Sequence, residues 1–382
     1  MPADHEMDDD VALRRSWPEL YDDVVRRGTR LRRRRRLVAV APVVAAAAAV
    51  VVGLLVTADD GHEAVRTVGE PTAGEPALRQ RVVFARVFDG GDGGTAIFLV
   101  DGDGSERRLS GDETFRDGSP AFSPDGAWIA FQSERDNPQL AVKRATDIYL
   151  MRPDGTDVRR LTTTQDPGLG NGVRHPAWSP GSAWLAVAAE DAADVSRILV
   201  LRPDGTEAHA ITDGPGDVGP VWSPDGEWIA FRRRPPGGTE ELWVVRPDGT
   251  GARRVVAGIH DGPVAWTPDG SRLTYTAELP DGRTRLFAVE ADGKRQAQLS
   301  RGPGVDNVDP AWSADGELLV YSDDPDGEYL VDREVGRPLE ITGGRQPGRL
   351  VVTVPGGDVV RTLTEPEDGD HDRGPSLAPP DG

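Results

Sequence analysis

The stretch PAFSPDGAWIAFQS, residues 120–133, decides the fold because it recurs in register along the chain. Taking Ser123 as the common position, successive copies lie 56, 44, 44 and 46 residues apart. Each copy has two short apolar or aromatic stretches around a turn rich in Pro, Ser, Asp and Gly, a pattern that predicts a β-hairpin. The other copies are PAWSPGSAWLAVAA from Pro176, PVWSPDGEWIAFRR from Pro220, PVAWTPDGSRLTYTA from Pro263 and PAWSADGELLVYSD from Pro310.

A second hairpin motif alternates with the first. Two hairpins in about 44 residues make four antiparallel strands per unit, and this period is typical of a β-propeller blade. An isolated blade leaves both faces of its sheet exposed, so neighbouring units must stack to bury them. The sequence therefore predicts an all-β ring. The second motif reads IFLVDGDGSERRLS from Ile97, IYLMRPDGTDVRRLT from Ile148, ILVLRPDGTEAHAIT from Ile198, LWVVRPDGTGARRVV from Leu242 and LFAVEADGKRQAQLS from Leu286.

The alternation of these two motifs resembles the TolB-type, WD-repeat-like propeller family over about residues 80–342. The resemblance implies a six-bladed β-propeller of four-stranded antiparallel blades. It also implies a module that usually binds a protein or ligand and that is attached to a hydrolase domain in some members.

The ends of the ring are less regular. RVVFARV at 81–87 is half of a first hairpin without its WSPDG strand, and EYLVDREVGRPLEIT at 328–342 is predicted to be a degenerate second motif. We expect LVVTV at 350–354 to close the ring, with residues 64–68 as the alternative. The propeller is predicted to span 80–356, and the acidic, Pro- and Gly-rich residues 357–382 are predicted to be a disordered tail.

Residues 37–57, LVAVAPVVAAAAAVVVGLLVT, carry no charge. As a helix they would be roughly 30 Å long, so they predict a single transmembrane helix. The Arg run at 32–36 favours a cytoplasmic N-terminus, residues 1–36. We therefore expect a cell-membrane protein whose propeller is extracytoplasmic, reached through a linker at 58–79. A cleaved signal peptide ending near Ala58 and a buried soluble helix are the alternatives.

Composition narrows the chemistry. The chain has no Cys, which excludes disulfides, thiol catalysis and Cys-bound metal clusters. Net charge is −20, which argues against a nucleic-acid partner. Lys occurs only at Lys143 and Lys294, and the Arg-, Ala-, Gly- and Pro-rich composition is typical of a GC-rich bacterium. No Gly-x-Ser-x-Gly, phosphate-binding GKS/GKT or HExxH motif occurs and no hydrolase domain follows, so we expect no catalysis and no cofactor.

The repeated residues are expected to be structural. Aromatic residues at one position of every blade are predicted to pack between blades. The Asp of each hairpin turn is predicted to bond its own backbone and not calcium. The aromatic residues are Phe122, Trp178, Trp222, Trp266 and Trp312, with a second set at Trp128, Trp184 and Trp228. The turn residues are Asp125, Asp154, Asp204, Asp225, Asp248, Asp269, Asp292 and Asp315.

The short turns should lie on one face of the disc and the longer, variable loops on the other, which is where a ligand is expected to bind. Residues just before each innermost strand should surround the mouth of the central channel. We also expect the basic run 232–234 on this face, where it would pair with acids across the channel or meet an anionic partner. The predicted ligand-binding residues are Asp117, Arg174, His175, Asp217, His260, Asp261 and Asp309, with Asp306 beside them.

Three functions compete. The first is a monomeric, membrane-anchored propeller that binds a protein, peptide or cell-envelope polymer. The second is a hydrolase or lyase with its site in the channel, where the His and Asp residues could also hold a divalent metal. The third is a transmembrane sensor resembling an anti-sigma regulator in layout. No metal site and no catalytic residue is assigned under the first, which we favour.

Overall fold

The structure is a computed structural model that describes residues 80–379 apart from several connections. The predicted cytosolic segment, membrane helix and linker all lie outside the described residues. Within the described part of the chain, no helix is long and apolar enough to cross a membrane. The connections left out of the description are 89–93, 103, 111–114, 137–145, 164–171, 192, 281, 301–305, 325–348, 354–358, 365 and 367–369.

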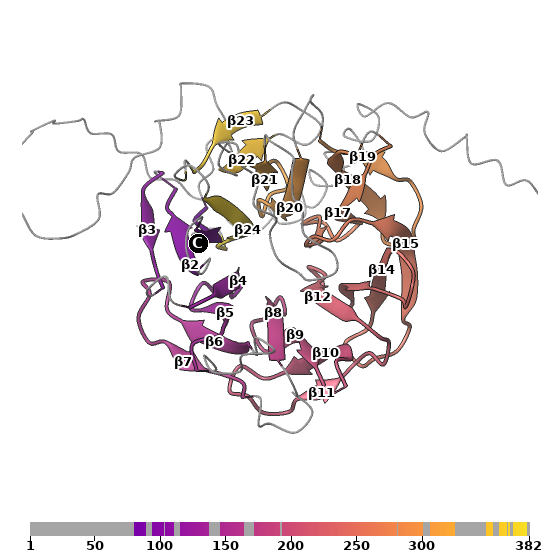
Figure 1. The fold of residues 1–382 in the computed structure, drawn as a ribbon, viewed down its shortest axis with the longest axis horizontal. Helices are drawn as coiled ribbons and strands as arrows, with labels where there is room; N and C mark the ends of the chain where they lie inside the picture. Colours follow the sequence, from indigo (N-terminus) through magenta and orange to yellow (C-terminus); the bar gives the residue numbers. More distant parts are fainter. Residues whose placement is uncertain are drawn as a thin grey trace, which may run out of the picture.

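The described strands form six sheets of four antiparallel strands, arranged as blades around a common axis, along which the predicted central channel would run (Figure 1). This confirms the predicted all-β, six-bladed architecture. From the channel outward, blade 1 is β24 (His371–Leu377), β1 (Val82–Val87), β2 (Thr95–Val100) and β3 (Glu106–Arg108). Blade 2 is β4 (Asp117–Phe122), β5 (Ile129–Ser133), β6 (Asp147–Met151) and β7 (Arg159–Arg160). Blade 3 is β8 (Gly172–Trp178), β9 (Leu185–Glu190), β10 (Ser196–Leu201) and β11 (His209–Ala210).

The other three blades follow the same order. Blade 4 is β12 (Asp217–Trp222), β13 (Ile229–Arg233), β14 (Glu240–Val245) and β15 (Arg253–Ile259). Blade 5 is β16 (Ala265–Trp266), β17 (Arg272–Glu278), β18 (Thr284–Glu290) and β19 (Ala297–Gln298). Blade 6 is β20 (Asp306–Trp312), β21 (Leu319–Asp324), β22 (Arg349–Thr353) and β23 (Val359–Thr362).

The ring closes through the C-terminal strand, which corrects two predictions. β24 pairs antiparallel with β1, from Val82 opposite Leu377 to Val87 opposite His371. Residues 357–382 are therefore not simply a disordered tail, because they contain β23 and β24. The strand HDRGPSL supplies the inner strand that blade 1 otherwise lacks, and it occupies the place of the WSPDG strand of the other blades. Its Asp, Gly and Pro match those of DVGPVW in β12, although Leu377 replaces the Trp.

Blade 6 also differs from the prediction. Residues 350–354 do not close the ring, because β22 is the third strand of blade 6 and pairs with β21 and β23. The Leu350 amide donates to Thr364 Oγ1 at 2.9 Å, as the Ile198 amide does to Thr212 Oγ1 at 3.0 Å in blade 3. The second motif of blade 6 is therefore LVVTVPGGDVVRTLT. The stretch 328–342, predicted to hold this hairpin, lies outside the described residues.

The turn residues behave as predicted. In the first hairpin, Asp125 Oδ1 accepts from Ser123 Oγ at 2.6 Å and from the Ala127 amide at 3.0 Å. In the second, Asp154 Oδ1 accepts from the Thr156 amide and hydroxyl at 2.9 and 2.6 Å. The other turn aspartates make equivalent local bonds, so each carboxylate stabilises its own turn.

The hydrophobic core is divided among the seams between blades. At the seam of blades 3 and 4, Ala186 and Ile198 pack against Ile229 and Phe231, all fully buried, and the other five seams have their own clusters. Each blade therefore depends on both neighbours for burial. Trp178 and Trp266 are also buried at seams, and their indole nitrogens donate to backbone carbonyls of the preceding blade at 3.2 Å. The prediction that these rings pack between blades is confirmed.

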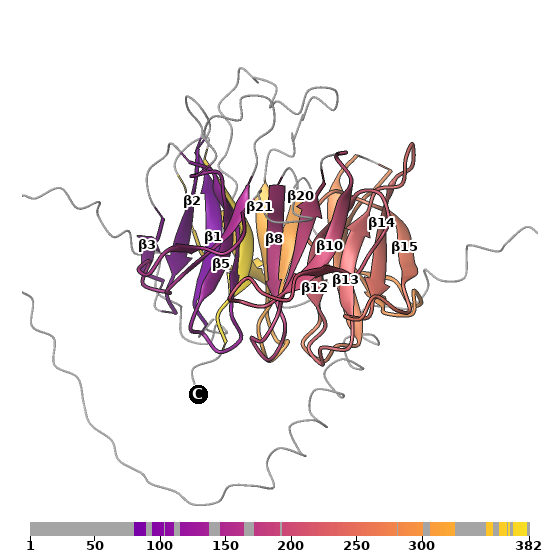
Figure 2. The same cartoon turned by 90° about the horizontal axis from the view of Figure 1, so that it is seen from below.

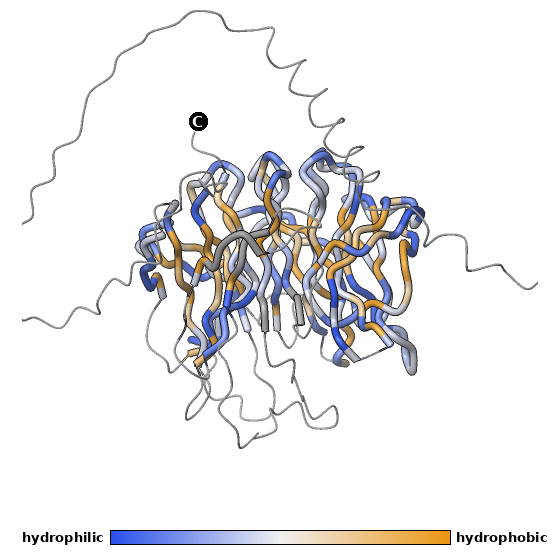
Figure 3. The backbone as a smooth tube through the Cα atoms, turned by 90° about the horizontal axis from the view of Figure 1, so that it is seen from above, coloured by the Kyte–Doolittle hydropathy of each residue, from blue (hydrophilic) through white to orange (hydrophobic). Residues whose placement is uncertain are grey.

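The short hairpin turns lie together on one face of the disc, at the bottom of Figure 2. Hydrophobic residues lie mainly in the strands, and hydrophilic ones mark the turns on this short-turn face (Figure 3). Gln80, the first described residue, lies on the same face, because its side chain contacts the turn residue Ala314 at 3.0 Å and Ala378 O at 2.6 Å. The opposite face, on which the inner strands begin, is the long-loop face.

Candidate binding site at the channel mouth

Every inner strand begins on the long-loop face, and five of them contain an irregularity at the same place. The residue three positions before the aromatic or Leu anchor has a positive φ in these five strands, although only Gly adopts this conformation easily. The pairing register with the second strand shifts beside it, which marks a β-bulge. These residues are Ser119, His175, Gly219, Asp309 and Gly374. β-Bulges often occur next to binding sites, where they change the direction of a side chain, so the five bulges indicate a candidate site at the channel mouth.

Two of the predicted site residues are instead structural. Asp217 is fully buried, and Arg233 donates to both of its carboxylate oxygens at 2.6 and 2.8 Å. The strand register places the two residues opposite each other, so the pair neutralises itself inside blade 4. Asp117 is also buried and accepts from Arg135 Nη2 at 2.8 Å, although its second oxygen has no hydrogen-bond partner. Asp217 is therefore unavailable to a ligand.

The centre of the candidate site is Arg232, in the middle of the basic run. Its guanidinium is buried, and Nη1 donates to Glu240 at 2.7 Å and also to Asp261 at the start of blade 5. Arg234 contacts the same two carboxylates, at 2.5 and 3.4 Å. Partial burial would raise the pKa of Asp261, but the charges of Arg232 and Arg234 outweigh it and hold the pKa below its usual value. The basic run is thus paired with acids of its own blade and of the adjacent blade 5, and not with acids across the channel as predicted.

His175 lies beside this cluster. Burial, together with the positive charges of Arg232 and Arg174, lowers the pKa of its imidazole to about 3, so the ring is neutral at physiological pH. Its backbone amide donates to Gln132 Oε1 of blade 2 at 3.1 Å. His175 Nδ1 and Arg232 Nε are both buried here without a hydrogen-bond partner. Unpartnered buried polar atoms cost stability, so they indicate capacity to hydrogen-bond a ligand.

The remaining predicted residues lie around the same mouth. Arg174 pairs with Glu190 within blade 3, and its Nε is buried without a partner. Asp309 is buried and accepts from the Gly374 amide at 3.1 Å, which joins blade 6 to blade 1. His260 Nδ1 lies 3.0 Å from the Asp261 carbonyl and is partly exposed. For Asp306 only its place at the start of β20 is described.

Polar groups at the mouth come from all six blades. Gln132 of blade 2 contacts His175 of blade 3, which lies in the electrostatic field of Arg232 and Asp261 from blades 4 and 5. Asp309 of blade 6 lies close to Gly262 of the adjacent blade 5, since a Cβ built on that glycine would be 3.9 Å from Asp309 Oδ1. On its other side, Asp309 accepts a hydrogen bond from the Gly374 amide of blade 1. We call this set the channel-mouth ring. It can donate and accept hydrogen bonds, and among its described residues no nucleophile lies beside a base.

Sequence reasoning missed Gln132, Glu190 and Glu240. These residues lie on the second and third strands, in positions where alternation alone predicts ordinary polar surface. The sequence does contain a signal for Gln132 and Arg232, because each follows the Phe of the first motif. Side chains alternate along a strand, so if the Phe packs in the seam between blades, the polar residue after it lies on the opposite face of the sheet. Among the described residues, no group of three or more His, Asp or Glu is arranged to hold a metal ion.

The described part of the chain is therefore a six-bladed β-propeller with a polar channel mouth. Residues 76–258 match the family model of the TolB beta propeller domain. By backbone, it is similar to TolB from Acinetobacter baumannii, with a TM-score of 0.58 and 17% identity over 80% of this chain and 69% of that one. It is also similar to a chain of the nidogen/laminin complex, with a TM-score of 0.52 and 12% identity over 78% and 98%. These likenesses concern the fold.

One curated relative also matches in sequence. The uncharacterized peptidase YuxL of Bacillus subtilis (strain 168) is 30% identical over 136 residues, which are 35% of this chain. The match spans 19% of that protein.

Proposed function

We propose that this chain is a membrane-anchored, extracytoplasmic propeller that binds a protein, peptide or cell-envelope polymer at the channel-mouth ring, without catalysis. The observation that carries the proposal is the pair of unpartnered buried atoms, His175 Nδ1 and Arg232 Nε, within a ring of polar groups from every blade. A main-chain carbonyl or a carboxylate of a ligand would accept from Arg232 Nε, and a neutral imidazole can either donate or accept.

The nature of the ligand follows from the fold and the loops. TolB-type propellers bind protein partners, and one similar structure is a nidogen/laminin complex. The mouth combines cationic, anionic and neutral polar groups, as a peptide backbone with mixed side chains would require. With a net charge of −20, the protein as a whole repels polyanions.

The membrane placement rests on residues 37–57 and the Arg run before them. Gln80 lies on the short-turn face, so an anchored chain would approach the propeller from that side. The linker 58–79 spans at most about 75 Å when fully extended. In this arrangement the chain enters on the short-turn face, which leaves the channel-mouth ring on the opposite face accessible to partners.

The test compares capture of membrane and envelope components by three forms of the full chain. In the first variant, His175→Asn and Asp261→Asn alter the mouth; Asn tolerates the positive φ of residue 175. The control, Glu227→Gln, removes one exposed charge on the short-turn face. Bound components are captured by chemical cross-linking. We expect the wild type and the control to capture the same partner and the mouth variant to lose it. Equal recovery by all three would contradict binding at this mouth.

A peptidase role is the second candidate, because the YuxL match falls on a protein described as a peptidase. If the channel were catalytic, the His175→Asn variant would abolish hydrolysis of a peptide library by the full chain. Absence of any hydrolysis by the wild type, with partner capture intact, would leave binding as the function.

A further inference from the structure

A second site lies away from the channel, on the short-turn face. The site includes a sequence position that is occupied by Trp in blades 2, 3 and 4 but not in blade 1. Trp128 lies between two cations, with the Arg152 guanidinium 3.8 Å and that of Arg159 4.8 Å from the ring centroid. Trp228 lies between Arg246 and Arg253 in the same way, at 4.6 and 5.1 Å. In these blades an aromatic ring satisfies the guanidinium groups.

Blade 1 has Arg81 at this position. The equivalence follows from the register, because Val82 pairs with Leu377 as Ile129 pairs with Phe122, so the preceding residues Arg81 and Trp128 correspond. The Arg81 guanidinium lies 5.7 Å from the centre of the Phe122 ring. Among the described residues it has no acidic partner, although it is partly buried. In blade 1 the Arg81 guanidinium thus occupies the position of the Trp ring against which arginines pack in blades 2, 3 and 4.

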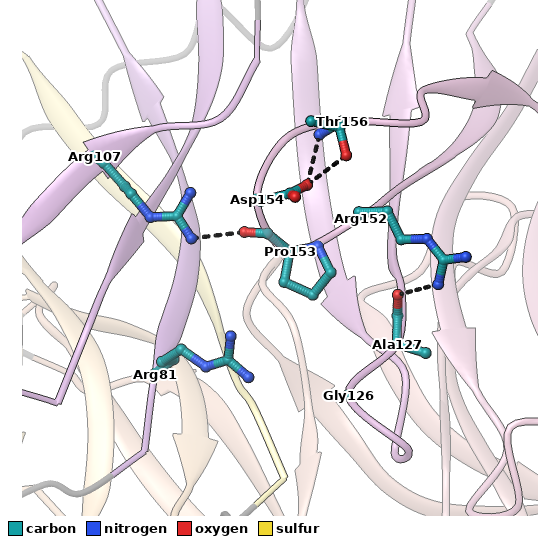
Figure 4. Close-up of a pocket in the computed structure, with 8 residues that line it drawn as sticks. All are labelled: Arg81, Arg107, Gly126, Ala127, Arg152, Pro153, Asp154 and Thr156. Carbon is teal, nitrogen blue, oxygen red and sulfur yellow. Dashed lines mark hydrogen bonds between the residues drawn. The ribbon is translucent and has the colours of Figure 1, made fainter.

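A cavity of about 560 Å³ opens at this seam between blades 1 and 2 (Figure 4). Arg81, Arg107 and Arg152 line it, with Asp154 as the one acidic group. The Asp154 carboxylate is exposed and is already engaged by Thr156, which donates twice to its Oδ1. Figure 4 shows the Arg81 side chain pointing toward Pro153 and Arg152 without any interaction drawn to it.

The other two arginines are held in place and keep spare donors. Arg107 Nη2 donates to Pro153 O at 2.8 Å, and its Nε lies 3.8 Å from Asp101. Arg152 Nη1 donates to Ala127 O at 3.2 Å. Since each guanidinium has five N–H donors, most remain available. The backbone bonds therefore orient these groups at the rim without exhausting them.

We propose that this cavity binds a small molecule through a phosphate or polycarboxylate group, with Arg81 as the principal contact. Three guanidiniums line the cavity, and Asp154 is the one carboxylate in its lining. Arg107 and Arg152 also pair with Asp101 and Asp157, at 3.8 and 3.5 Å, whereas Arg81 has no acidic partner among the described residues. Guanidinium matches the geometry of both anions through paired N–H groups. The volume lies in the range of small-molecule sites, roughly 300–1,000 Å³, and far exceeds what a single inorganic ion fills. The site is separate from the channel-mouth ring and does not depend on the function proposed for it.

The test is titration of the full chain with pyrophosphate and with citrate, at constant ionic strength maintained with NaCl, followed by calorimetry. Two variants remove the site differently. Arg81→Gln deletes the charge, and Arg81→Trp installs the indole that blades 2–4 carry, which should preserve folding. We expect saturable binding of at least one anion by the wild type and a loss of about tenfold or more in both variants. The anion that binds more tightly distinguishes phosphate from carboxylate recognition.

The matched control is Arg202→Gln, which removes a guanidinium stacked on Trp184 at 3.9 Å on the same face of blade 3. This control should bind as the wild type does. Three results would each overturn the proposal: no binding of either anion by the wild type, unchanged binding by Arg81→Trp with its melting temperature intact, or equal loss in Arg202→Gln. The last result would mean that the anions act only through the general charge of the protein.

Discussion

Arg86 donates to both carboxylate oxygens of Asp372, at 2.6 Å from Nε and 2.9 Å from Nη2, across 286 residues of sequence. Asp372 is fully buried, and Arg86 also holds Glu106 on the outermost strand of blade 1. One guanidinium therefore joins the C-terminal strand to the first blade. The pair corresponds to Asp217 and Arg233 in blade 4, where the same positions bond within one continuous hairpin. In blade 1 the contact closes the ring.

Replacing Arg86 by Gln should destabilise the propeller strongly. The change leaves Asp372 and Glu106 without their counter-charge, and loss of one partner from a buried ion pair costs about 3–5 kcal/mol. Urea unfolding of the full chain measures this loss. The control is Lys294→Gln, since the Lys294–Asp292 pair is largely exposed and should contribute little to stability. A similar small effect of both substitutions would show that Arg86 does not secure the closing strand.

Acid should weaken the fold through His175. Its pKa is lowered from 6.5 to about 3 in the folded chain, so between these values the unfolded chain binds a proton that the folded chain does not. The free energy of unfolding therefore falls as pH drops below 6.5, by about 2 kcal/mol at pH 5 from this group alone. Between pH 7.5 and pH 5, the free energy of unfolding of the His175→Asn variant should therefore fall by about 2 kcal/mol less than that of the wild type, as measured by urea unfolding. Identical pH dependence in the two proteins would refute this role.

The indole hydrogen bonds between blades can be measured with a matched pair of substitutions. Trp266 Nε1 donates to Val221 O at 3.2 Å, whereas Trp222 Nε1 is buried without a partner. Both Trp→Phe changes remove similar ring volume, but only Trp266→Phe removes a bond. We expect it to be more destabilising than Trp222→Phe by about 1 kcal/mol. Equal losses would assign the stability of these positions to ring packing alone.

The proposed topology can be tested because the chain has no Cys. Ala208→Cys places a single thiol at an exposed position of blade 3. A membrane-impermeant maleimide should label it in spheroplasts without permeabilisation. Ser16→Cys, before the apolar segment, should be labelled only after the membrane is opened. Labelling of Ala208→Cys only after permeabilisation would place the propeller in the cytoplasm.

Much of the fold could be predicted because the hairpin signals are local. The Asp-Gly turns and flanking apolar pairs identify blades 2 to 5 directly. Closure could not be predicted from the same signals, because in HDRGPSL the anchoring Trp is Leu377 and the next residue is Ala378 instead of Ser. The strand also lies in an acidic stretch whose composition is typical of disorder. Its structure depends on pairing with β1, an interaction between the two ends of the domain, and on contacts with the neighbouring blades.

The candidate site was less predictable for a related reason. The sequence indicates which residues lie at the start of each inner strand, but burial decides which of them remain available to a ligand. Asp217 and Arg233 are 16 residues apart, and only the hairpin register brings them into a self-neutralising pair. Arg232, the neighbour of Arg233 in sequence, points to the other side of the strand and joins Glu240 and Asp261. The sequence shows which residues are charged, whereas the pairing of strands determines which of those charges are neutralised by an ion pair.

The antiparallel pairing of β24 with β1 has a mechanical consequence. Gln80 and Ala378, where the described chain enters and leaves the ring, are hydrogen-bonded neighbours on one face. A pulling force between them would load the Val82–Leu377 pair first and then the pairs behind it in sequence. The seam would peel open bond by bond instead of resisting as a block in shear, so under tension this strand pair is where the ring should yield.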